Sequence, residues 1–143
     1  MKIFFIAIAA IVVVVGAATF LLPKPSGTVS SNDPNVIART GLHIHPTLAI
    51  YVKGVKQDLP ANLGIVGASM APVHTHDDMP IIHLEFSGLV RKEDITLGKF
   101  FEVWGKDMRS FGANVKMTVN GVENTEYEQY IMKDGDKIEL RYD

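Results

Sequence analysis

The sequence predicts a small α+β domain, a mostly antiparallel sheet with one packed helix, behind an N-terminal transmembrane helix. Three observations lead to this fold class. Residues 3–22 form an uncharged apolar run, residues 97–104 carry one apolar helical stripe, and the rest of residues 41–143 alternates extended segments with turn dipeptides. One helix among short strands is typical of domains in which the helix covers one face of a sheet.

Residues 1–22 predict a signal anchor that stays attached to the protein. The run IFFIAIAAIVVVVGAATFLL holds 20 residues without a charge. At about 1.5 Å per residue, this run spans roughly 30 Å, the thickness of the hydrocarbon core. Cleaved signal peptides have apolar regions of about 7–15 residues, and the small residues Gly16 and Ala18 lie inside the run rather than after it. We therefore expect an uncleaved span.

The anchor also predicts where the protein works. Lys2 before the span and Lys24 after it bias the topology only slightly toward an N-terminus inside the cell. Because the anchor is made first and everything else follows it, we expect a single-pass protein of the cell membrane with its domain on the extracytoplasmic side. Small residues at 16–18 suit close packing against a membrane-protein partner. The net charge of −2 gives no basic field for nucleic acid.

Residues 23–40, PKPSGTVSSNDPNVIART, predict a flexible linker. Its prolines, serines, glycine and asparagines disfavour both helix and sheet. The folded domain is then expected over residues 41–143. The chain has no cysteine, which excludes a disulfide framework and any thiolate metal site.

The first half of the domain predicts strands. The extended segments are residues 42–52, 55–59, 73–76 and 81–86. Lys53-Gly54 is a tight-turn dipeptide, residues 60–72 are Gly- and Ala-rich and predict a loop, and residues 77–80 predict a turn.

The second half of the domain predicts the helix and a hairpin. Thr96 is a suitable N-cap and Gly105 a suitable residue after the C-cap of a helix over residues 97–104. Asn120-Gly121 predicts a hairpin turn. The ending KDGDKIELRY is similar to the last strand of β-grasp (ubiquitin-like) domains, and this resemblance implies a β-grasp-like sheet.

All five histidines lie between residues 43 and 83, and four of them form two H-x-H pairs. The pairs are His43/His45 and His74/His76, and the fifth histidine belongs to the H-x-E pair His83/Glu85. In a strand, residues i and i+2 lie on the same face, roughly 6.5–7 Å apart. Rings that lean inward from such positions can share a metal with bonds of about 2.0–2.1 Å, and a neighbouring strand can supply a third ligand.

The repeated spacing predicts a metal site made of these five histidines and Glu85. Asp77 is a further candidate, as a ligand or as a partner that orients an imidazole. Three alternatives stay open at this point: a polar strand face, hydrogen-bonded structural pairs, and a pH-sensitive cluster that charges near pH 6.5 without a metal.

Imidazole ligands suit zinc, copper, iron and nickel. The lack of cysteine excludes a blue-copper site, and Met70 and Met79, which flank His74 and His76, carry thioethers that favour copper(I). Nitrogen-rich sites also bind copper more tightly than zinc. We therefore expect a transition metal ion, with copper ahead of zinc.

The motif blocks resemble a family of small prokaryotic proteins that are often membrane-anchored or secreted. The matching blocks are GLHIHP, PANLGI, PVHTHD, IIHLE, LGKFFEVWG and DGDKIELRY. The resemblance covers nearly all of residues 41–143 and implies a membrane-anchored or secreted domain, but it supplies no assigned chemistry. A weaker resemblance is to cupins, whose first motif has H-x-H followed closely by Glu. Here Glu85 lies nine residues after His76, which departs from the cupin spacing.

Three functions follow as hypotheses. The first is a metal-binding module that captures, delivers or buffers copper or zinc. The second is a metal-dependent enzyme of cupin-like type, with Glu85 or Asp77 as the general base. The third is an accessory subunit or scaffold of a membrane complex.

Overall fold

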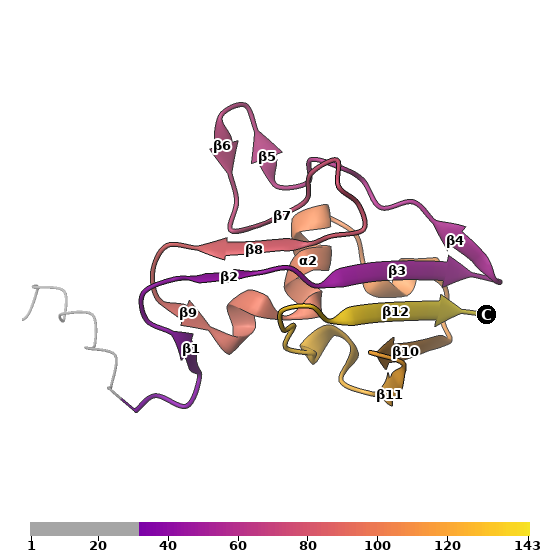
Figure 1. Ribbon diagram of the computed structural model, residues 1–143. Coiled ribbons are helices and arrows are strands. Elements are labelled where there is room, and N and C mark those ends of the chain that lie inside the picture. Colours follow the sequence, from indigo (N-terminus) through magenta and orange to yellow (C-terminus); the bar gives the residue numbers. More distant parts are fainter. Residues whose placement is uncertain (1–31) are drawn as a thin grey trace, which may run out of the picture. The chain divides into compact units, whose positions relative to one another are not determined.

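The computed structural model describes residues 32–143, and Pro34–Asp143 form one compact unit (Figure 1). The signal anchor expected at residues 1–22 lies outside the described residues. Within residues 32–143, no helix is both long and apolar enough to cross a bilayer.

The unit combines short strands with one α-helix, as the α+β prediction requires. The strands are β1 (Val36–Ala38), β2 (Leu42–Ile44), β3 (Thr47–Val52), β4 (Val55–Gln57), β5 (Ile65–Val66), β6 (Ser69–Met70), β7 (Val73–His74), β8 (His83–Phe86), β9 (Val90–Arg91), β10 (Val115–Val119), β11 (Val122–Asn124) and β12 (Lys137–Tyr142). The helices are α2 (Leu97–Trp104) and the short 3-10 turns η1 (Lys92–Ile95), η2 (Met108–Phe111) and η3 (Tyr127–Gln129).

The largest sheet has the strand order β11-β10-β12-β3-β4. Its central strand β12 runs antiparallel to β10 and parallel to β3, beside which it lies in Figure 1. Alternate residues of these two strands, among them Leu48, Ile50, Ile138 and Leu140, are buried. The alternation of apolar side chains in the sequence therefore marks the core face.

The helix α2 has the bounds that the sequence predicts. Thr96 Oγ1 accepts a hydrogen bond of 3.2 Å from the Lys99 amide, and Gly105 closes the helix with a left-handed φ of 67°. Leu97 and Phe100 are fully buried in the same core as the large sheet. The helix thus packs through its apolar stripe.

The strand expected over residues 42–52 is in fact two strands, so the prediction of a continuous strand was wrong. Pro46 has no amide hydrogen for a sheet, and the His45 amide donates instead to Asp134 Oδ1 at 2.9 Å. The chain changes sheets at this point. Strand β2 pairs with β8, whereas β3 pairs with β12 and β4.

The predicted loop over residues 60–72 contains a two-stranded hairpin, β5–β6. Gly64 and Gly67 have positive φ angles of 71° and 60°, and the hairpin extends away from the larger sheets in Figure 1. These strands are too short for a period of two residues to be visible in the sequence.

The ordered unit also begins earlier than residue 41. Strand β1, inside the range expected to be a linker, pairs antiparallel with β9. Ala38 packs against the core. Pairing with a distant strand therefore gives structure to a segment whose composition predicts none.

Candidate metal centre

The histidines lie on a separate three-stranded sheet of order β2-β8-β7. The antiparallel register puts His43 opposite Glu85 and His74 opposite His83. Between these positions, Leu84 of β8 is fully buried in the core. The prediction that the three histidine segments lie side by side is confirmed.

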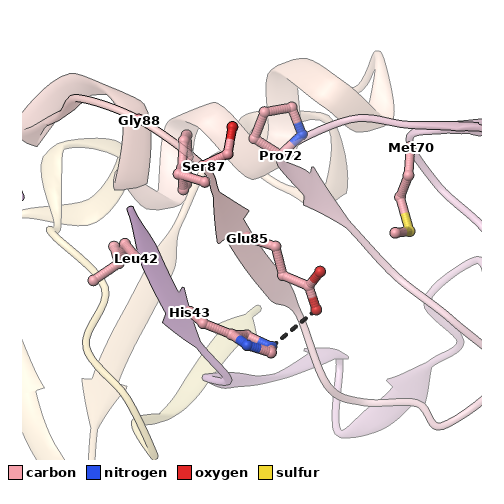
Figure 2. A pocket seen from close by; sticks show the side chains of 8 residues that line it. Leu42, His43, Met70, Pro72, Glu85, Ser87 and Gly88 are labelled. Atoms are coloured by element: carbon pink, nitrogen blue, oxygen red, sulfur yellow. Dashed lines mark ion pairs between the residues drawn. The ribbon is translucent and has the colours of Figure 1, made fainter. Parts of the chain in front are cut away.

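Four of the side chains form what we call the outer group, which consists of His43, His45, His83 and Glu85. Their ligand atoms all lie within 4.8 Å of one another. His43 Nε2 lies 3.1 Å from His45 Nε2 and 2.9 Å from Glu85 Oε1, an ion pair drawn in Figure 2. This group faces solvent, since the side chains of His43 and Glu85 are 60% and 35% exposed.

Three side chains form the inner group, which consists of His74, His76 and His83. Their ligand atoms also lie within 4.8 Å of one another. His74 Nε2 and His76 Nε2 are 3.2 Å apart, and His74 is fully buried. His83 belongs to both groups.

A hydrogen bond determines which nitrogen of His74 carries the hydrogen. Its Nδ1 lies 2.9 Å from the Ala71 carbonyl oxygen, which can only accept, so Nδ1 carries the hydrogen. Burial lowers the pKa of His74, against a smaller opposing effect of the Ala71 hydrogen bond. The ring is therefore neutral near pH 7, and its Nε2 lone pair faces His76. A ligand histidine is typically oriented in this way by a hydrogen bond at its other nitrogen.

His83 has one nitrogen in a hydrogen bond and one without a hydrogen bond. Its Nε2 lies 3.1 Å and 3.3 Å from the two carboxylate oxygens of Asp78, so Nε2 is the donor. Its Nδ1 is buried and, among residues 32–143, is the one buried side-chain nitrogen or oxygen without a hydrogen bond. Leaving such an atom unsatisfied costs about 1–3 kcal/mol, and binding an ion is one of the ordinary ways to satisfy it.

The His83 ring is also the centre of the cluster. Its centroid lies 4.8 Å from that of His45, 4.7 Å from that of His76 and 5.2 Å from that of His74. Two nitrogens bound tetrahedrally to one ion at 2.0–2.1 Å are about 3.3 Å apart. The two Nε2–Nε2 distances of 3.1 Å and 3.2 Å are close to this value.

The structure brings six of the seven candidate residues together and leaves one aside. Those in a group are His43, His45, His74, His76, His83 and Glu85. Asp77 is in neither group and accepts a hydrogen bond of 3.1 Å from Asn62 Nδ2. The carboxylate at His83 belongs to its neighbour Asp78, which the sequence argument missed. The Asp-Asp dipeptide was the available signal, but the turn decides which carboxylate faces the ring.

An open cavity of about 520 Å³ adjoins the outer group. Its lining residues are Leu42, His43, Met70, Pro72, Glu85, Phe86, Ser87 and Gly88 (Figure 2). In Figure 2, His43 and Glu85 face each other across β2 and β8, and Met70 lies on the other side of the cavity. The outer group is therefore reachable by an ion or small molecule from solvent.

Comparisons of the chain with protein families, curated proteins and solved structures found no match. The resemblance to small prokaryotic membrane-anchored domains therefore stays a prediction. The chemistry of the cluster rests on its own geometry.

The stability of the metal-free protein is expected to fall as the pH drops below 6.5, the usual pKa of a histidine. Because burial lowers the pKa of His74, the unfolded chain takes up this proton at a higher pH than the folded chain. The stabilising contribution is complete above 6.5 and is lost as the pH falls toward the lower pKa of the folded state. Urea denaturation at about pH 7.5 and about pH 5.5 with a chelator present measures the effect. The His74→Gln variant should show a weaker pH dependence, and equal midpoints for the wild type at both pH values would contradict the prediction.

Proposed function

We propose that this protein binds a transition metal ion through its histidine cluster, with copper preferred over zinc. The observation that carries the proposal is the buried Nδ1 of His83, which has no hydrogen-bond partner and belongs to a ring that contacts three other imidazoles. The buried nitrogens of a structural histidine pair are normally hydrogen-bonded, and this nitrogen is not. A bound ion would satisfy it.

The donor set supports the preference for copper. The inner group offers imidazole nitrogens alone, and the outer group adds one carboxylate. Sites of this kind bind divalent copper more tightly than zinc.

The proposal is tested by loading the full chain, purified without a histidine tag, with copper or zinc. After desalting, elemental analysis is expected to find about one ion per chain. The double variant His45→Asn/His76→Asn removes one ligand from each group and should lose the ion, whereas Asp77→Asn, outside both groups, should retain it. A wild-type chain that retains neither copper nor zinc would overturn the proposal.

We further propose that the protein is held at the extracytoplasmic face of the cell membrane by residues 1–22. The uncharged run of residues 3–22 supports this localisation. The test is cell fractionation with an alkaline wash, followed by protease treatment of intact cells. Recovery of the chain in the soluble fraction would contradict the proposal.

A metal-dependent enzyme is the second candidate, favoured by the cavity at His43 and Glu85. In this alternative the three imidazoles of the outer group would hold the ion, and Glu85, which lines the cavity, would act as general base for a bound substrate. The copper-loaded protein should then bind azide and change its visible spectrum, because an enzyme keeps an open coordination position. A spectrum that does not respond to azide favours the carrier.

We also infer a β-grasp-like arrangement for the large sheet. Strands β3 and β4 form a hairpin before α2, and β12 lies in the centre, parallel to β3. In this arrangement β7 and β8 belong to an insertion between β4 and α2. An experimentally determined structure with a different strand order would overturn the inference.

A further inference from the structure

We propose that the cluster holds one ion at a time, in either of two positions, and that the charge of the ion selects the position. A divalent ion takes the outer group, and copper(I) takes the inner group. The inference rests on the proposed metal binding and extends it to the discrimination between ions.

The capacity of one ion follows from His83, which both groups require. An imidazole has two nitrogens, and here Nε2 is held by both oxygens of Asp78 at 3.1 Å and 3.3 Å. Nδ1 has no hydrogen bond and lies 3.8 Å from Glu85 Oε1. A second ion would have to remove the Nε2 hydrogen and displace Asp78. Occupation of one group therefore excludes occupation of the other.

The inner group suits an ion of low charge. Its three ligands are imidazoles, and His74, one of them, is fully buried with its lone pair set by the Ala71 carbonyl. Asp78 is not a member of the group and contacts only the nitrogen of His83 that is already protonated. The cost of moving an ion out of water grows with the square of its charge, so copper(I) loses about a quarter of what a divalent ion loses.

The outer group suits a divalent ion. It provides three imidazoles and the Glu85 carboxylate, a set of four ligands. Four-coordinate sites with nitrogen and carboxylate ligands are typical of zinc. The carboxylate neutralises one of the two charges, and the 60% exposure of the His43 side chain lets water stabilise the remainder. Copper(I) carries one charge and needs less stabilisation by water, so the exposure of the outer group gives copper(I) no advantage there.

The test compares two matched variants of the full chain. Zinc affinity is measured by competition with a chelator, and copper(I) affinity is measured without oxygen by competition with a copper(I)-specific chromophoric chelator. Glu85→Gln should weaken zinc binding on the order of 10–100-fold and change copper(I) binding by less than about threefold. His76→Asn should weaken copper(I) binding on the order of 10–100-fold and change zinc binding by less than about threefold.

The zinc affinity of His76→Asn also reports its folding, because zinc uses the intact outer group. Equal losses for both ions in both variants would overturn the inference. So would a wild-type chain that retains two ions at once. A wild-type chain that binds neither ion would instead refute the proposed function itself.

Discussion

Replacement of His83 by asparagine is expected to weaken the binding of both zinc and copper on the order of 100-fold or more. His83 is the one residue common to both groups. It carries the buried nitrogen without a hydrogen bond, and its ring contacts the rings of His45 and His76. No other single substitution in the cluster removes a ligand from both groups. Chelator competition with each metal measures the loss.

The matched control for His83 is Asp78→Asn. This variant keeps the ring and its free Nδ1 and weakens only the contact that orients the ring at Nε2. We expect a smaller loss, on the order of tenfold, for both metals. Circular dichroism confirms folding in each case. A folded His83→Asn chain with wild-type affinity would show that His83 is not a ligand.

Replacement of Asp136 by alanine is expected to reduce the free energy of unfolding by about 2–4 kcal/mol. Asp136 is only 5% exposed. Its carboxylate accepts hydrogen bonds from the Tyr130 hydroxyl at 2.7 Å, the Lys133 amide at 2.9 Å and Asn120 Nδ2 at 3.0 Å. Burial and the contact with Asp136 raise the pKa of Tyr130, so its hydroxyl stays protonated and remains a donor. Alanine would leave these donors without an acceptor.

Urea denaturation of Asp136→Ala gives the stability difference, with Tyr130→Phe as the control. The control removes one donor and no acceptor, so we expect a loss of about 1 kcal/mol. The turn at residues 133–136 also carries Asp134, which accepts the His45 amide hydrogen. Asp136→Ala should therefore weaken metal binding at the outer group as well. A wild-type denaturation midpoint for this variant would contradict the assigned role.

The elements that sequence analysis predicted correctly are those with local signals. The helix has its own N-cap in Thr96 and its own closing glycine in Gly105. The turn at Asn120-Gly121 needs positive φ angles, and these are 53° and 81°. Such preferences act within a few residues and do not depend on the rest of the fold.

The elements that were missed depend on distant partners. Strand β1 forms because β9 pairs with it. Strand β2 ends where the His45 amide donates a hydrogen bond to Asp134, which lies far along the chain. The β5–β6 hairpin has strands too short for a periodic pattern. Composition therefore predicted a linker and a loop, and local alternation predicted one continuous strand.

For the candidate site, the sequence by itself determined which residues could share a face, because side chains two apart in a strand lie on the same side. This spacing identified the three pairs that end at His45, His76 and Glu85. Only the tertiary structure decided that the three strands are neighbours, that His83 serves two groups of unequal burial, and that Asp78 rather than Asp77 contacts it. The physical reason is that the adjacency of strands and the burial of side chains arise from hydrogen bonding and packing between segments far apart in the chain. The spacing of residues within one segment does not determine them.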